Sequence, residues 1–164
     1  MRLTKLGVFI GFVAINAMTS VYAGNPALVE RLKNTNECEK CDLSGTDLSN
    51  LNLASANLKR ANISGANLRN TNLASADLSG AILSGSNLRA ANLANANLAN
   101  AKLDTANLTE TNLGSANLTN ASLLSVYLWE TNFAGANMKG ARLKASSRSG
   151  CNGTGSDGTP LQKC

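Results

Sequence analysis

The sequence contains no histidine, and aromatic residues make up only 4% of its 164 positions. Without histidine the chain lacks the commonest general base and the commonest neutral metal ligand, which argues against most classes of enzyme. The apolar run at 6–18 is shorter than the roughly 20 residues that a membrane-spanning helix needs. Catalysis and a membrane anchor are therefore both disfavoured at the outset.

The amino terminus has the three parts of a secretory signal peptide. A basic start with Arg2 and Lys5 precedes the apolar run, and a small-x-small cleavage pattern ends at Ala23. We expect residues 1–23 to be removed, which places the mature protein outside the cytoplasm and leaves it not embedded in a membrane. Loss of two basic residues leaves 13 against 10 acidic ones, so the mature net charge is +3.

A five-residue pattern continues without insertion through residues 41–145. The central residue of each block is Leu in 18 of 21 blocks, and the residue two positions earlier is Ala in 13. On a helix such leucines would spread around the cylinder, and on one strand they would alternate between the two faces. They share a core only if the chain turns once per block. The residue before the centre is Asn or Asp in 16 blocks, which suits turns.

The blocks "ANLKR", "ANLRN", "ADLSG" and "ANLAN" resemble the A(D/N)LXX pattern of the pentapeptide repeat family. The resemblance implies an all-β fold, a right-handed quadrilateral parallel β-helix with four blocks per coil, and therefore about five coils in 41–145. Similar exported proteins with an N-terminal helix and a CxxC motif occur in the bacterial periplasm and the thylakoid lumen. Cytoplasmic members that mimic DNA bind gyrase, but export and the basic net charge argue against that alternative here.

The two ends of the repeat need caps, because an open β-helix end exposes both core and backbone. Residues 24–40 predict a capping helix and linker, with Asn25 as N-cap and an apolar face of Leu28, Val29 and Leu32. Leu51, an oversized inward residue of the first coil, is expected to fill the space beneath this helix. Residues 146–164 form a Ser- and Gly-rich tail outside the repeat.

Four cysteines in an exported chain indicate disulfides. We expect a structural Cys38–Cys41 bond in "CEKC" and a Cys151–Cys164 bond that staples the tail. A redox motif, a zinc site and free thiols are the alternatives for Cys38 and Cys41. The inward repeat position of Cys41 and the lack of a βαβ context argue against the redox alternative.

Residues 20 apart stack if a coil holds four blocks, so the outer faces can be predicted. One face is an uncharged column of asparagines, which is either a docking wall or a solvated ladder: Asn52, Asn72, Asn92, Asn112 and Asn132. The adjacent face changes sign, from Arg69 and Arg89 to Glu110 and Glu130, and therefore lacks the sustained basic stripe that nucleic acid requires.

One outward patch is unusual in the repeat. Leu124, Tyr127 and Trp129 fall at outward positions of the last full coil, where they form either an interface or a surface that the tail covers.

The acidic residues do not form a catalytic constellation. Asp42, Asp47, Asp77 and Asp104 lie on different blocks with no base, nucleophile or phosphate loop beside them. The sequence therefore predicts an exported, non-catalytic structural or protein-interaction module without a cofactor or small-molecule substrate. A protein is the class of partner that its rigid faces would bind.

Overall fold

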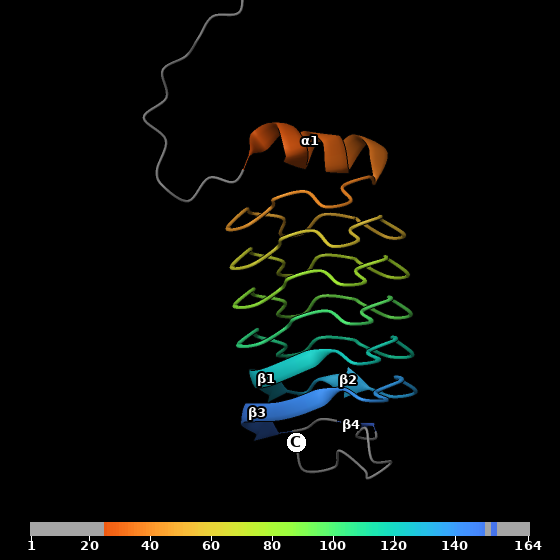
Figure 1. The fold of residues 1–164 in the computed structure, drawn as a ribbon. Helices are drawn as coiled ribbons and strands as arrows, with labels where there is room; N and C mark the ends of the chain where they lie inside the picture. Colours follow the sequence, from red (N-terminus) through yellow and green to blue (C-terminus); the bar gives the residue numbers. More distant parts are fainter. Residues whose placement is uncertain (1–24, 150–151, 154–164) are drawn as a thin grey trace, which may run out of the picture.

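The computed structural model describes residues 25–149 and 152–153, which form a stack of coils beneath one helix (Figure 1). The helix α1 spans Pro26–Thr35. Four strands follow in the last coils: β1 Ser122–Trp129, β2 Asn132–Phe133, β3 Arg142–Ser149 and β4 Asn152–Gly153. Strand β1 pairs in parallel with β3, and β2 pairs in parallel with β4.

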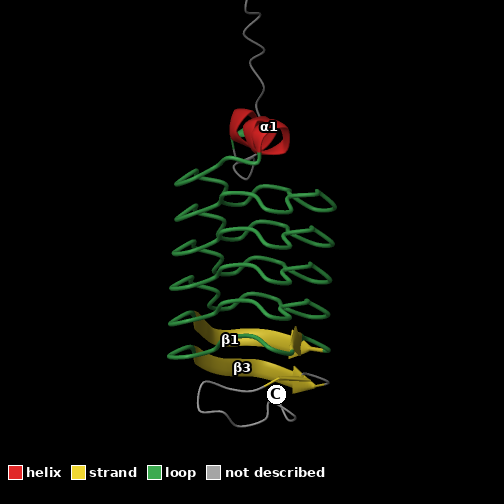
Figure 2. Cartoon of the chain, turned by 90° about the vertical axis from the view of Figure 1, so that its right-hand side faces the viewer, coloured by secondary structure: helices red, strands yellow, loops and turns green. Residues whose placement is uncertain are grey.

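Parallel β-bridges join residues that are 20 apart in sequence, from Glu37↔Asn57 to Asn117↔Asn137. Each coil therefore contains four blocks of five, as the family resemblance implies, and the predicted β-helix with one short N-terminal helix is confirmed. The right-handed coiling stays a prediction. With the β2–β4 pairs included, the ladder runs from Glu37 to Gly153, so it extends past both ends of the 41–145 range. Most coils pair through isolated bridges, and within the described part of the chain extended strands appear only in the last coils (Figure 2).

The coil turns because one residue per block adopts a left-handed backbone conformation. Every fifth residue from Lys40 to Gly140 has a positive φ. Most of these corners are closed by a hydrogen bond such as that from Ala61 N to Leu58 O, at 3.1 Å. A positive φ at the residue just before the donor, here Arg60, is the signature of a type II turn. Between corners, backbone groups bond the next coil, as Leu58 N does to Asp77 O at 2.8 Å.

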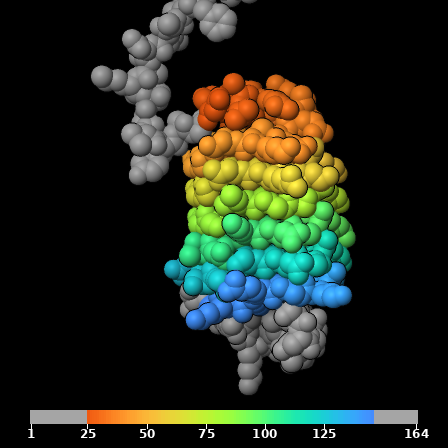
Figure 3. Space-filling model, in the orientation of Figure 1, coloured from red at the N-terminus to blue at the C-terminus, as the bar shows by residue number. Residues whose placement is uncertain are grey.

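The central residues of the blocks fill the interior. All of them from Leu43 to Phe133 are fully buried, and the small residues two positions earlier pack beside them. Where that small residue is Thr, its hydroxyl is also satisfied: Thr71 Oγ1 donates to Leu48 O and Thr111 Oγ1 to Leu88 O, both at 2.8 Å. No buried side-chain nitrogen or oxygen in the described part of the chain lacks a hydrogen-bond partner. Figure 3 shows the resulting close packing of successive layers.

The helix α1 closes the N-terminal end of the stack (Figure 1). The Asn25 side chain accepts a hydrogen bond from Ala27 N at 3.0 Å, and Pro26 occupies the first helical turn, as predicted. Leu32 is fully buried in the hydrophobic core. Leu28, Val29 and Leu51 are partly buried and pack against the same core. The predicted cap and its apolar face are confirmed.

Two predicted features lie outside the described residues, namely the 1–23 signal peptide and the Cys151–Cys164 bond. Within the described ranges, no helix is long and apolar enough to cross a membrane.

Candidate interaction surface

The uncharged face is a closed hydrogen-bonded ladder. Asn72 Nδ2 donates to Asn52 Oδ1 at 2.9 Å, and the same bond recurs up the column to Asn132. Each Oδ1 also accepts a bond from the backbone N–H two residues later, for example Ala74 N to Asn72 at 3.2 Å. Because both ends of these amides are used within the fold, their hydrogen bonds hold coils together and few remain for a partner.

On another face the column of ladder side chains is interrupted after Asn62, and the carboxylate of Asp104 supplies hydrogen bonds there instead. Ile82, Lys102 and Ser122 stand where the pattern expects Asn or Asp. Asp104, from a different position in its block, accepts bonds from Ser122 Oγ at 2.6 Å and from Leu124 N at 2.8 Å. Asp104 therefore has a structural role that its position in the repeat pattern did not predict.

The remaining aspartates are also engaged in turns. Hydrogen bonds from the Ser44 hydroxyl and amide hold the pKa of Asp42 below its ordinary value, and Ser49 has the same effect on the pKa of Asp47. Burial raises the pKa of Asp77, but hydrogen bonds from Ser79 and the ammonium of Lys59, 3.2 Å away, outweigh it and lower the pKa overall. Among the described residues no group of three or more His, Cys, Asp or Glu could hold a metal ion.

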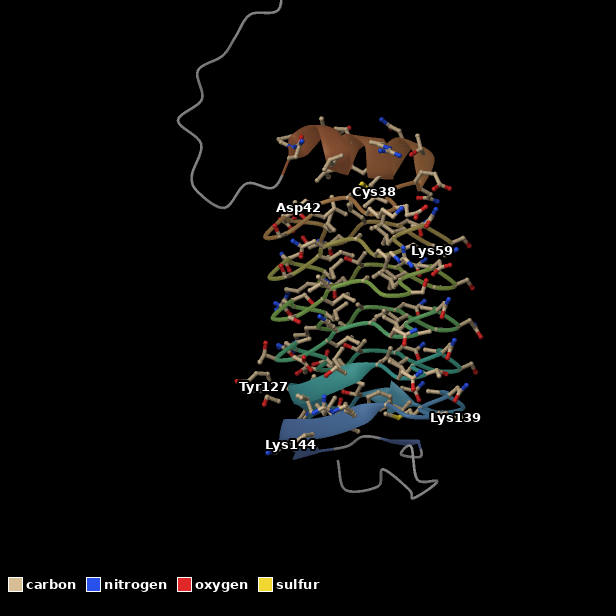
Figure 4. All side chains as sticks on the ribbon, viewed as in Figure 1. Cys38, Asp42, Lys59, Tyr127, Lys139 and Lys144 are labelled. Carbon is tan, nitrogen blue, oxygen red and sulfur yellow. A yellow bond between two sulfur atoms is a disulfide. The ribbon has the colours of Figure 1, made fainter. Side chains whose placement is uncertain are left out.

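The CEKC segment is a disulfide beneath α1. The sulfurs of Cys38 and Cys41 are 2.06 Å apart, Cys38 is fully buried and Cys41 is nearly so. The label of Cys38 in Figure 4 lies directly below the helix. The bond spans the first corner of the coil, at Lys40, which agrees with a structural disulfide.

The exposed aromatic residues lie on the face that changes charge. Tyr127 and Trp129 are both 51% exposed, and they alternate with buried residues along β1. Figure 4 shows Tyr127 extending outward from the side of the stack. Leu124, the third residue of the predicted patch, is half-buried and precedes the corner at Ser125, so it lies on the neighbouring face.

A shallow hollow of about 370 Å³ opens above the aromatic pair, with six lining residues: Arg89, Thr109, Glu110, Tyr127, Leu128 and Trp129. Backbone bonds stack Arg89 over Thr109 and Thr109 over Trp129, through Ala90 N to Thr109 O and Glu110 N to Trp129 O. The short Thr109 between two long side chains leaves the depression. The role of Thr109 was not predicted, although the 20-residue spacing of Arg89, Thr109 and Trp129 indicates that they stack.

The charges of this face are ordered along the stack. Arg69 lies one coil above Arg89, and Glu130 one coil beyond Glu110. Arg89 Nη2 bonds Glu110 Oε1 at 2.8 Å, which joins the basic half to the acidic half. We name the set Arg69, Arg89, Thr109, Glu110, Tyr127, Trp129 and Glu130 the aromatic surface.

Comparison with protein-family models matches pentapeptide repeats, in eight copies, at residues 37–74, 71–110 and 111–147. A comparison with curated proteins finds no match.

Solved pentapeptide repeat proteins are similar to the chain. One from Nostoc PCC 7120, alr5209, is 26% identical with a TM-score of 0.52, and covers 77% of this chain and 100% of its own. Rfr23 of Cyanothece 51142 is 30% identical over 77% of this chain and 97% of its own, with a TM-score of 0.36. A pentapeptide repeat protein from the thylakoid lumen of Arabidopsis thaliana is 28% identical over 68% of this chain and 73% of its own, with a TM-score of 0.39. The family model covers most of the chain in the segments that form the coils, and the chain therefore belongs to the pentapeptide repeat family.

Proposed function

We propose that this protein is an exported, non-catalytic interaction module that binds a protein partner through its aromatic surface. The observation that carries the proposal is the half-exposure of both Tyr127 and Trp129 beside the Arg89–Glu110 ion pair. Tyr, Trp and Arg are the residues most enriched at the centres of protein interfaces. Pentapeptide repeat proteins are generally non-catalytic, which agrees with the proposal.

The repeat supports recognition because it holds this surface rigid. The corners that follow Arg69, Arg89 and Thr109 are each closed by a backbone hydrogen bond, such as Thr111 N to Leu108 O at 3.1 Å. Trp129 also lies on a strand that pairs along most of its length with β3. A surface ordered before binding loses little conformational entropy on association.

Export is supported by the basic and apolar N-terminal sequence with its small-x-small pattern. Gyrase binding by DNA mimicry is not favoured, because mimicry needs a sustained acidic surface. The aromatic surface instead has two arginines and two glutamates, and the neighbouring asparagine face is uncharged.

The test is a pull-down from the extracytoplasmic fraction with the mature protein and a Tyr127→Ser, Trp129→Ser double variant. Ile82→Ser is the matched control, since Ile82 is an exposed apolar residue at 37% on another face. Thermal melts establish that all three proteins fold equally.

We expect a partner that the wild type and Ile82→Ser capture and the double variant loses. A partner that the double variant captures equally well, or a wild type that binds neither another protein nor itself, would overturn the proposal.

A further inference from the structure

We propose that the partner which the aromatic surface fits is a second copy of this chain, bound antiparallel across a two-fold axis. This inference rests on the proposed function, because it uses the same surface. The axis would lie in the interface, perpendicular to the stack, between the levels of Arg89 and Thr109. Interfaces of this kind are isologous, so a surface must be complementary to itself.

The charge order meets that requirement. Four successive coils present Arg69, Arg89, Thr109 with Glu110, and Trp129 with Glu130. Reversal of this order by the axis places Arg69 of one copy opposite Trp129 and Glu130 of the other. It also places Arg89 of one copy opposite Thr109 and Glu110 of the other. Each positive level thus meets a negative level.

Among the described residues, the two outermost charges of this surface form no ion pair. Arg69 and Glu130 are exposed, and within the described residues neither belongs to a salt bridge, whereas Arg89 and Glu110 are bonded to each other. In the antiparallel dimer the guanidinium of Arg69 would lie over the exposed indole of Trp129 with the carboxylate of Glu130 beside it. A guanidinium is attracted both to an aromatic face and to a carboxylate.

The hollow supplies the matching shape. Thr109 has a short side chain and would lie opposite Arg89 of the other copy. The depression at Thr109 gives that arginine room to reach the Glu110 beside this Thr109. A parallel arrangement would lose all of these contacts, because it would set Arg69 against Arg69 and Glu130 against Glu130. Like charges placed opposite each other select against that arrangement.

The contact is small, so we expect weak association. Four coil levels span about 15 Å when neighbouring strands are ~4.8 Å apart. This height is short for the roughly 800 Å² per partner that stable complexes bury. The dimer should therefore appear at high protein concentration and weaken as salt is added, because exposed charges are screened.

The experiment is sedimentation velocity of the mature protein over a concentration series, with Arg69→Glu and Glu130→Arg measured singly and as an equimolar mixture. Each single variant sets like charges opposite each other in its own dimer, so self-association should weaken about tenfold or more. In the mixture both contacts are again of opposite sign, and the heterodimer should recover the wild-type affinity. Lys102→Glu is the control, since it makes the same charge change on another face and should associate as the wild type does.

Single variants that associate like the wild type, or a mixture that fails to associate, would overturn the dimer. These results would leave the pull-down free to succeed with a different protein, so the failure of the dimer and the failure of the proposed function can be told apart.

Discussion

The corner residues adopt a left-handed backbone conformation that is rare for residues other than glycine. All 21 corners from residue 40 to residue 140 have a positive φ, yet only six of them are glycine. Most of the others are Asn or Ser, but Ala90 and Thr105 also occupy corners, with φ of 56° and 60°. An L-residue in this region is less stable than in the right-handed helical region by roughly 1–2 kcal/mol. The strain at these positions is local and can be measured by substitution.

Ala90→Gly should stabilise the protein by about 1 kcal/mol, because the gain from removing Cβ at positive φ exceeds the extra chain entropy of glycine. The same substitution at Ala99 is the matched control. Ala99 is also half-buried, but it precedes a corner and its φ is not positive. Ala99→Gly should destabilise by roughly 0.5–1 kcal/mol. Denaturant unfolding measures both, and equal effects of the same sign would contradict the corner assignment.

The ladders are the elements that join one coil to the next, and their chemistry varies with position. Most rungs are asparagine, but Asp42, Asp47 and Asp77 occupy ladder positions and accept bonds from Asn62, Asn67 and Asn97. Their pKa values are lowered in the folded state, chiefly by bonds from the following serines for Asp42 and Asp47. Asp77 keeps a lowered pKa despite its burial.

The lowered pKa of these aspartates makes stability depend on acid. A carboxyl whose pKa is depressed by folding stabilises the fold above its unfolded pKa of about 3.9, and this stabilisation is lost as the pH falls through the folded value. The melting temperature should therefore fall as the pH decreases below about 4. A triple variant with Asn at 42, 47 and 77 should show a smaller decrease, because asparagine keeps the ladder without titrating. An unchanged acid dependence in thermal melts would show that other groups control it.

The elements were predictable from the sequence where one block determines them. The five-residue period required a turn in each block and inward leucines, and Asn25 with Pro26 marked the start of the cap. The number of blocks per coil depends on the angle of each turn, which the pattern does not contain, and it was available only through the family resemblance. The role of Asp104 and the hollow at Thr109 were missed, because each arises between residues of neighbouring coils.

At the scale of the whole molecule, the described residues form a linear array in which each coil contacts only its neighbouring coils, and the helix α1 packs on the first coil. Leu58, Leu78 and Leu98 occupy equivalent positions in three successive coils. All three are fully buried, so the core is continuous along the stack. The aromatic surface spans four coil levels, which means that its geometry depends on the cooperative order of the array. A defect in a middle coil should therefore disrupt the binding surface together with the fold.

A charge placed in the interior should show this dependence. Leu98→Arg buries a guanidinium in a middle coil with no partner, and since an unpaired buried charge costs several kcal/mol, we expect the solenoid to unfold. Asn100→Arg adds the same charge two residues later, at an exposed corner. Arginine tolerates the positive φ of such a position, because Arg60 occupies another corner with a positive φ. Its effect on the free energy of unfolding should be within about 0.5 kcal/mol. Circular dichroism melts compare the two variants, and if both melt alike the assignment of inward and outward positions is wrong. Retention of self-association by Leu98→Arg would instead show that the aromatic surface survives without the continuous core.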